Sequence, residues 1–424
     1  MQPQADQRRL MARTGAATFA LALLSSGALA CGQEIIPPTG PFNVGVSKHA
    51  IDFVNPGDWL APGNVTTSFL ATVYYPTLED EPVPPARYLH PGGLRALAEM
   101  LAVVAGDIDH EAIANLMSSH LRWGAKPAPA AALLERVRRN HTTLIWSAGG
   151  RGGPAEMSTM LLSDLASRGY AVVGLDHPYE QPFVWYPNPS APGGGGPLDP
   201  GVTLVAGPPS TLDLSEDLVR AIYGTRLREM KHMVESGWPE LVKKQGWPFA
   251  TDGMGLLGLS LGGATALGTL HDTSEALTRA GLNLDGGMQA PPGQDVGKGR
   301  PQLLFGSWFH VSADDPAPAP GAWVDQTWED YTASQTGWWR RTLTDDYGHW
   351  DALDAAYWKD LVKHTMPANI VGSIPGARAV DITRRTVAAF FDKWTRGIED
   401  EAGLLDNPGR VFKEMKLVAG QDGK

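Results

Sequence analysis

The sequence feature that most constrains the fold is a short apolar run that ends at a serine set among glycines. Residues 254–259 read Met-Gly-Leu-Leu-Gly-Leu and lead directly into Ser260, which Leu261 and Gly262 follow. The next residues, Gly-Ala-Thr-Ala-Leu-Gly at 263–268, have the composition of a helix. Small residues flank a serine in this way where a strand turns into a helix too tightly for larger side chains. The run therefore predicts a strand, a sharp turn and a helix in direct succession.

The rest of the chain alternates between strand-like and helical patterns. Runs rich in β-branched, aromatic and aliphatic residues predict strands at 65–75, 142–146, 170–175, 281–284, 302–305 and 339–344. Apolar residues at helical spacing predict helices at 157–168, 212–235 and 381–396. Strands that alternate with helices predict the α/β class, with a mostly parallel, doubly wound sheet.

Two stretches interrupt this alternation and set the expected domain limits. Residues 92–139 carry Leu, Ala and Met clusters at helical spacing and predict a helical insertion, whereas the proline- and glycine-rich residues 182–211 predict a long surface loop. We expect one main domain over residues 65–400, preceded by an N-terminal segment at 31–64 and followed by a C-terminal tail at 401–424.

The first 30 residues have the layout of a signal peptide. Arg8, Arg9 and Arg13 precede an uncharged, mostly apolar stretch that ends at Ala28-Leu29-Ala30. The paired arginines permit a twin-arginine export route as well as the general one. Cys31, the single cysteine, follows the predicted cleavage site and would be a lipidation site in a bacterial lipoprotein. We therefore expect a secreted or periplasmic protein, with simple cleavage favoured over lipidation.

Charge and motif content narrow the expected partners. The 424 residues carry a formal net charge of -11 with no block of like charges, which makes nucleic acid an unfavourable partner. Asp107, Asp109 and Glu111 resemble a fragment of a calcium loop but lack its glycine and its remaining ligands. We expect no nucleic-acid partner, no cofactor and no metal.

Ser260 becomes a candidate nucleophile only if the chain supplies a base and an acid. A serine hydroxyl reacts poorly at neutral pH without a histidine within hydrogen-bond reach, and that histidine needs a carboxylate to fix its tautomer. His310, His349 and His364 lie beyond the strands that follow Ser260. His349, in Asp-Tyr-Gly-His-Trp just after the last predicted strand, has the position expected for the base. His310 and His364 are more simply interpreted as surface or packing residues.

Two positions compete for the role of the acid. Asp285 ends a predicted strand in Asn-Leu-Asp-Gly-Gly, where the glycines leave room for its carboxylate to turn inward. Asp314 and Asp315 follow the next strand, but they lie in a run rich in proline and alanine that is typical of a solvated loop. The residues alone favour Asp285 and leave the pair open.

The tetrahedral intermediate of acyl transfer also needs two backbone N–H donors for its oxyanion. Leu261, the residue after the nucleophile, has the position of one donor. The other is expected in the turn Ser-Ala-Gly-Gly-Arg-Gly-Gly at 147–153, with the N–H of Gly150 as first choice. An ordinary glycine-rich turn is the alternative interpretation of that segment.

Several segments together resemble the plasma-type platelet-activating factor acetylhydrolases and the related bacterial dienelactone-hydrolase-like esterases of the α/β-hydrolase class. They are Val73–Pro76, Trp146–Gly150, Leu165–Val173 with Asp176–Pro178, Gly258–Ala264, Leu284–Gly286 and Gly348–Trp350. The resemblance spans about residues 65–395. It implies a Ser260–Asp285–His349 triad with Leu261 and Gly150 as oxyanion donors, since the family's acid lies on the strand after the nucleophile helix.

This chain departs from the family at two places. The family has His-Gly at the oxyanion turn, where this chain has Ala148-Gly149, and the 182–211 loop has no clear counterpart. His177 would lie beside the site, either as a functional residue or as a structural one. These departures affect the identity of the substrate more than the type of reaction, because the oxyanion donors are backbone groups.

The leading functional hypothesis is a serine carboxylesterase for short-acyl esters, including the acetyl group of phospholipids that resemble platelet-activating factor. A second is a secreted polyester or cutin-type hydrolase, suggested by the predicted secretion and by the aromatic residues Trp185, Tyr186 and Trp350. A third, which Ala148 keeps open, is a non-catalytic binding protein on the same fold. A weak membrane-surface contact through residues 92–104 is less favoured than packing of that segment on the body.

Overall fold

The computed structural model describes residues 33–81, 86–90, 92–93, 113, 115–118, 120–137, 142–187, 202–204, 215–291, 293–308, 310–311, 323–361 and 370–423. The predicted signal peptide, Cys31, Asp107, Asp109, Glu111, Asp314, Asp315, His364 and most of 92–104 lie outside these residues. No helix in the described ranges is long and apolar enough to cross a membrane.

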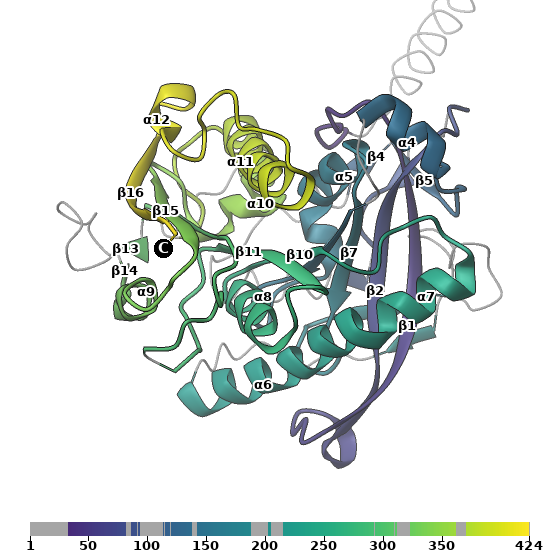
Figure 1. The fold of residues 1–424 in the computed structure, drawn as a ribbon. Coiled ribbons are helices and arrows are strands. Elements are labelled where there is room, and N and C mark those ends of the chain that lie inside the picture. Colours follow the sequence, from purple (N-terminus) through teal and green to yellow (C-terminus); the bar gives the residue numbers. More distant parts are fainter. Residues whose placement is uncertain are drawn as a thin grey trace, which may run out of the picture.

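A ten-stranded mixed sheet forms the centre of the molecule (Figure 1). Its spatial order is β16-β15-β12-β11-β10-β6-β7-β2-β1-β5. In chain order the strands are β1 (Asn43–Pro56), β2 (Val65–Thr77), β5 (Leu121–Trp123), β6 (Thr143–Ser147), β7 (Ala171–Asp176), β10 (Met254–Leu259), β11 (Thr278–Leu284), β12 (Gln302–Ser307), β15 (Trp338–Thr344) and β16 (Met415–Asp422). The six strands from β15 through β7 run parallel, and β16, β2 and β1 add antiparallel pairings toward the two edges.

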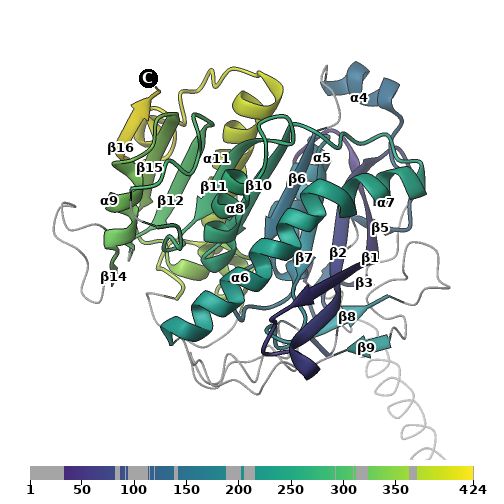
Figure 2. The same ribbon diagram turned by 60° about the horizontal axis from the view of Figure 1, so that its bottom comes forward.

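Helices cover both faces of this sheet (Figure 2). The longer ones are α4 (Ala130–Val137), α5 (Thr159–Ser167), α6 (Glu216–His232), α7 (Trp238–Gln245), α8 (Leu261–Asp272), α9 (Gln326–Thr332) and α11 (Gly376–Arg396). The short ones are η1 (Pro62–Asn64), η2 (Ala155–Ser158), η4 (Met233–Gly237), η5 (His349–Ala352), α10 (Ala355–Trp358) and α12 (Pro408–Val411). The π-helical turn η4 joins α6 to α7. This three-layer arrangement confirms the predicted doubly wound α/β sheet.

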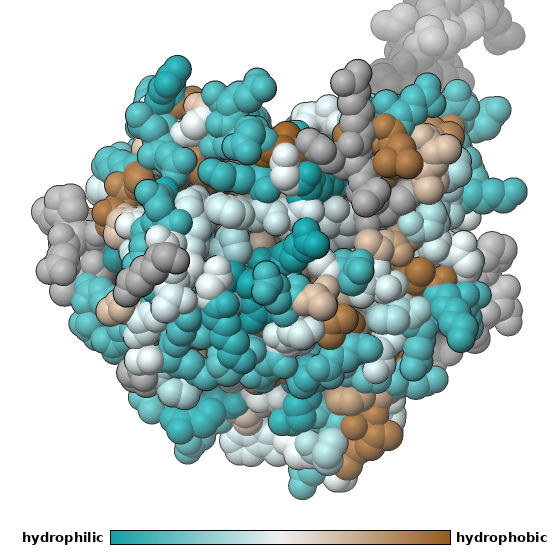
Figure 3. All heavy atoms as spheres, viewed as in Figure 1, coloured by the Kyte–Doolittle hydropathy of each residue, from teal (hydrophilic) through white to brown (hydrophobic). Residues whose placement is uncertain are grey.

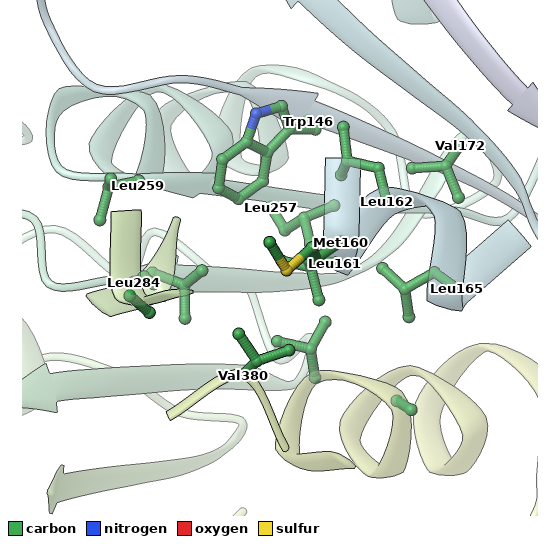
Figure 4. Close-up of a cluster of buried hydrophobic side chains, with 14 of the residues drawn as sticks. Trp146, Met160, Leu161, Leu162, Leu165, Val172, Leu257, Leu259, Leu284 and Val380 are labelled. Carbon is green, nitrogen blue, oxygen red and sulfur yellow. The ribbon is translucent and has the colours of Figure 1, made fainter. Parts of the chain in front are cut away.

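The two largest clusters of the core lie one on each face of the sheet, because successive strand residues point to opposite faces. Trp146, Leu257 and Leu284 face α5 and α11, where they meet side chains such as Met160 and Val380 (Figure 4). The other cluster joins the alternate strand residues to α6, α7 and α8. Every residue of the central strand β10 is buried, which is the pattern expected of a parallel strand covered on both faces.

The predicted strands are all present, but the sheet extends further at both edges than the sequence indicated. The N-terminal segment contributes the long strand β1, and the expected tail contributes β16, whose burial pattern is mostly exposed or intermediate. Edge strands need only one partner and carry polar side chains. A search for apolar runs therefore misses β16, because the strand contains polar residues such as Lys416, Gln421 and Asp422.

The two interrupting stretches also contain strands. In the predicted helical insertion, α4 is helical as expected, but Leu121–Trp123 is strand β5, which pairs with β1 in parallel register. In the predicted loop, β8 (Val184–Tyr186) pairs with β9 (Val202–Leu204). The prediction of a loop without regular elements was wrong. Two short segments, one before and one after the proline- and glycine-rich stretch, pair with each other as antiparallel strands.

Candidate active site

Ser260 lies in a strained turn between β10 and α8. Its backbone has φ 55° and ψ −126°, a combination that costs a non-glycine residue about 1–3 kcal/mol. The glycines on both sides are sterically required. A Cβ at Gly258 would lie 2.4 Å from the carbonyl oxygen of Gly262, and a Cβ at Gly262 would lie 2.1 Å from that of Ser147. The glycine-flanked serine of the sequence thus forms the tight strand–helix turn that it predicts.

Asp285 follows β11 directly and lies beside the serine. The Ser260 N–H donates to the Leu284 carbonyl at 2.7 Å, and a Cβ at Gly286 would lie only 2.0 Å from the Ser260 carbonyl oxygen. Asp285 itself has φ 55° and is buried. Its Oδ1 accepts the Ser307 N–H at 2.6 Å, which fixes the carboxylate at the end of the strand.

His349 begins the short helix η5, just after β15, and is hydrogen-bonded to Asp285. Its Nδ1 lies 2.6 Å from Oδ2 of Asp285, and its side chain is 28% exposed. A hydrogen bond from Nδ1–H to the carboxylate leaves Nε2 as the nitrogen that can accept a proton. The structure therefore brings the predicted acid and base into direct contact, next to the strained serine.

The predicted oxyanion turn packs against the serine and its neighbour. A Cβ at Gly149 would lie 3.6 Å from Cβ of Ser260, and one at Gly150 would lie 3.2 Å from Cβ of Leu261. Leu261 is the first residue of α8, and the first N–H groups of a helix have no acceptor within it. The Gly149-Gly150 turn thus packs against the side chains of Ser260 and Leu261.

Of the two interpretations of His310, packing residue fits and surface residue does not, because His310 is buried against Trp328 and also contacts the candidate acid. Its Nδ1 lies 3.2 Å from Oδ1 of Asp285, its Nε2 lies 2.6 Å from Oδ2 of Asp325, and its side chain is only 2% exposed. Burial alone would lower the pKa of His310, but the two carboxylates outweigh it and raise that pKa to about 9. The same contacts hold the pKa of Asp285 and that of Asp325 below their ordinary values despite burial. Asp285 therefore binds two histidines, one partly exposed and one buried.

A buried polar network lies beneath the oxyanion turn, and the sequence analysis missed most of it. His177 Nε2 lies 3.0 Å from Oγ of Ser147, and His177 Nδ1 lies 2.6 Å from Oε2 of Glu229 on α6. Burial lowers the pKa of His177 well below its ordinary value and raises that of Glu229 to about 8. Burial therefore disfavours the charged form of both groups. His177 thus lies in the supporting structure, away from the reacting atoms.

A small apolar cluster borders the oxyanion side of the site. Leu218 and Ile222 of α6 pack with Leu261, and Leu60, between β1 and β2, lies against them. Trp59, the preceding residue, is 51% exposed. The face shown in Figure 3 is mostly hydrophilic, with several separate apolar patches.

The aromatic residues that suggested an exposed binding surface do not form one. Trp185 and Tyr186 are buried, and Trp350 is partly buried against the main core cluster. Trp185 stacks on His90 and lies under the ammonium of Lys48. Packing accounts for these side chains, as it does for most tryptophans in folded proteins. Within the described ranges no group of three or more His, Cys, Asp or Glu side chains is arranged to hold a metal ion.

Comparison with solved structures identifies the fold. The chain superposes on a ferulic acid esterase from Streptomyces cinnamoneus with a TM-score of 0.68 and 24% identity, over 92% of this chain and all of that one. The chain has the α/β-hydrolase fold. This confirms the predicted fold class, and the elbow at Ser260 lies at the carboxyl end of a central strand, as the α/β-hydrolase fold requires.

A search of curated proteins gives a consistent result. The chain is similar to a probable 1-alkyl-2-acetylglycerophosphocholine esterase of Arthroderma benhamiae, at 24% identity over 289 residues. The match covers 65% of this chain and 65% of the relative, so the chain spans just under two thirds of that protein's length. No family model matches the chain. Both similar proteins bear esterase names, in agreement with the class of enzyme expected from the sequence.

Proposed function

We propose that this protein is a serine carboxylic-ester hydrolase that acts through an acyl-enzyme on Ser260. The Oγ of Ser260 attacks the ester carbonyl carbon while Nε2 of His349 accepts the hydroxyl proton. The N–H groups of Leu261 and Gly150 stabilise the oxyanion of the tetrahedral intermediate. His349 then protonates the leaving alcohol, and the acyl group stays on Ser260.

Deacylation repeats these steps with water as nucleophile. His349 takes a proton from water, the hydroxide adds to the acyl carbon, and the second tetrahedral intermediate collapses to release the carboxylic acid and restore the Ser260 hydroxyl. Asp285 orients His349 throughout and stabilises the imidazolium. One observation carries the proposal: the 2.6 Å contact of His349 with Asp285, formed beside a strained serine between β10 and α8.

We infer that the substrates are short-acyl esters, with acetylated glycerophospholipids as the leading class. The name of the Arthroderma benhamiae relative supports this substrate class, and so does the family resemblance of the sequence. The polyester alternative loses the support of Trp185 and Tyr186, which are buried, and keeps the support of the predicted export.

The test is a series of p-nitrophenyl esters from acetate to palmitate, run beside an acetylated ether phospholipid, methyl ferulate and an insoluble polyester. We expect the highest kcat/KM on the shortest esters, turnover of the acetylated phospholipid, and no activity in Ser260→Ala. A preference for long chains, or for the ferulate ester, would contradict the substrate assignment and leave the serine mechanism in place. Activity that survives in Ser260→Ala would contradict the mechanism itself.

Export is a separate proposal that rests on residues 1–31. We expect a protein expressed from the full-length gene in a bacterial host to be recovered outside the cytoplasm after cleavage at Ala30. N-terminal sequencing and mass spectrometry distinguish simple cleavage from lipidation at Cys31. Recovery of the uncleaved chain in the cytoplasm would contradict the proposal.

A further inference from the structure

Arg226 on α6 is the most unusual buried residue near the site. Its side chain is fully buried, and it donates through all three guanidinium nitrogens. Nε donates to Oε1 of Glu180 at 2.8 Å, and Nη2 donates to the same carboxylate. The buried charge is therefore paired, as a buried arginine requires. The remaining donors point at the oxyanion turn.

The acceptors on the turn are two successive carbonyl groups. Nη1 of Arg226 donates to the Ala148 carbonyl, and Nη2 donates to the Gly149 carbonyl at 2.9 Å. Nη1 also lies 3.3 Å from Oγ of Ser147, which is linked to His177 and through it to Glu229. One guanidinium thus contacts Ser147 at the end of β6 and donates to the carbonyl groups of the Ala148–Gly149 and Gly149–Gly150 peptides.

The orientation of these carbonyls determines the orientation of the N–H groups. In a planar trans peptide the carbonyl and the N–H point in opposite directions. The Gly149 carbonyl belongs to the same peptide as the Gly150 N–H, and the Ala148 carbonyl to the same peptide as the Gly149 N–H. With both carbonyls held toward Arg226, both N–H groups point away from it. The Gly149 carbonyl also accepts the Gly152 N–H at 3.0 Å, so Arg226 and the turn itself both hold that peptide. The peptide between Ala148 and Gly149 is held by Nη1 of Arg226, and a glycine allows it to rotate when that contact is lost.

We propose that Arg226 is a positioning residue that holds the turn after β6 in the orientation required for its N–H groups to stabilise an oxyanion. This inference rests on the proposed esterase function. Arg226 has no hydrogen bond to Ser260, Asp285 or His349, and Glu180 neutralises its charge. Its effect on catalysis is therefore geometric. If a peptide of the turn rotated, it would present a carbonyl oxygen to the developing negative charge.

This role separates transition-state binding from substrate binding. An oxyanion donor that is displaced weakens only the tetrahedral species, since the planar ester makes little use of it. The Oγ of Ser260 adds to the carbonyl carbon of a trifluoromethyl ketone and gives a stable hemiketal oxyanion. The matching methyl ketone binds largely unreacted, as an analogue of the ground state. The ratio of the two inhibition constants therefore reports the state of the oxyanion site.

Arg226→Lys is the informative variant. The ammonium of lysine keeps the positive charge, but it lacks the planar set of donors that binds Glu180 and two carbonyl groups at once. We expect kcat/KM for p-nitrophenyl acetate to fall about 10- to 100-fold. The inhibition constant of the trifluoromethyl ketone should rise by a similar factor, while that of the methyl ketone stays within twofold. All assays are made at least 10 °C below the melting temperature of each variant.

Arg384→Lys is the matched control. Arg384, on α11, is also buried and donates to three backbone carbonyls, those of Ile36, Pro37 and Met160, at 2.8–2.9 Å. Its replacement should lower the melting temperature as much as Arg226→Lys does, without changing the ratio of the two inhibition constants. A purely structural role for Arg226 predicts that the two variants behave alike, and that result would overturn the proposal.

A second variant covers the case in which Arg226→Lys does not fold. Glu180→Gln keeps the guanidinium but removes the anion that anchors it, so we expect the same ratio to change in the same direction, by about threefold to tenfold. A folded variant at either position with the wild-type ratio would overturn the inference and leave the esterase function intact. Wild-type protein without Ser260-dependent hydrolysis would overturn both.

Discussion

The two sides of Asp285 carry histidines in contrasting surroundings. On one side, His349 contacts Oδ2 through Nδ1 and is 28% exposed. On the other, His310 contacts Oδ1 through Nδ1 and Asp325 through Nε2, and is 2% exposed. Both ring nitrogens of His310 are occupied by carboxylates. Only His349 has a nitrogen left to exchange a proton with a substrate.

The comparison shows that contact with the acid does not by itself define a catalytic base. His310 stays protonated at neutral pH because two carboxylates hold its proton, so it acts as a fixed cation that keeps Asp285 ionised and in place. The base must instead combine contact with the acid and access to the serine. Four predictions test this division of roles, ordered from the largest expected effect to the smallest.

Replacing His349 should have the largest effect on turnover. We expect His349→Gln to lower kcat by about 10⁴-fold or more, because the proton of Ser260 then has no acceptor. The melting temperature should change little, since the side chain is partly exposed. His271→Gln, which alters a histidine near the end of α8 paired with Asp272, is the control and should keep full activity. A fall of less than tenfold for His349→Gln would mean that another group is the base.

Replacing the acid should rank second. We expect Asp285→Asn to lower kcat by about 10³- to 10⁴-fold, because the amide favours the wrong tautomer of His349. It should also destabilise the fold, since His310 loses one of its two carboxylates. Asp314→Asn tests the alternative acid that the sequence left open, and we expect this variant to retain activity. If only Asp314→Asn abolished turnover, the assignment of the acid would be wrong.

Replacing His310 should affect stability more than turnover. In His310→Gln the carboxylate of Asp325 loses its buried cation, which we expect to cost about 3 kcal/mol in the free energy of unfolding. We expect kcat to fall less than tenfold. Urea denaturation and steady-state kinetics measure the two effects on one preparation. A loss of kcat as large as that of His349→Gln, with unchanged stability, would reverse the roles of the two histidines.

The pH dependence of stability should show the smallest effect. The pKa of His310 rises from 6.5 to about 9 on folding, so its contribution is complete below about pH 6.5 and is lost as the pH rises through 9. The difference in free energy of unfolding between wild type and His310→Gln should therefore be large at pH 6 and shrink toward pH 10. On the acid side, the lowered pKa values of Asp285 and Asp325 predict a loss of stability as the pH falls below about 4. A constant difference from pH 6 to 10 would contradict the buried cation.

The candidate site divides into a part that the sequence predicted and a part that it could not. The strand, glycines and helix around Ser260 are neighbours in the chain, so a local pattern reveals them. The position of His349 follows from the order in which parallel strands present their carboxyl ends at one edge. Strand order allows Asp285 as the acid but also allows Asp314, and the family resemblance supported Asp285.

The supporting residues depend on contacts between distant segments. Arg226 lies 79 residues from Ser147, and His310 meets Asp325 across residues whose composition resembles a solvated loop. One signal was present in the sequence: Leu218, Ile222, Arg226 and Met230 recur every four residues on α6, so the arginine interrupts an apolar stripe. A charge in that position needs a buried partner, but the sequence does not say which.

The most direct test of the central claim is active-site labelling. Wild-type protein is treated with a fluorophosphonate, and the modified peptide is identified by mass spectrometry. We predict one label per molecule, on Ser260, with a labelling rate that falls by several orders of magnitude in His349→Gln and far less in His310→Gln. Labelling at another residue, or ester hydrolysis by protein that is not labelled, would contradict the assignment of Ser260 as the nucleophile.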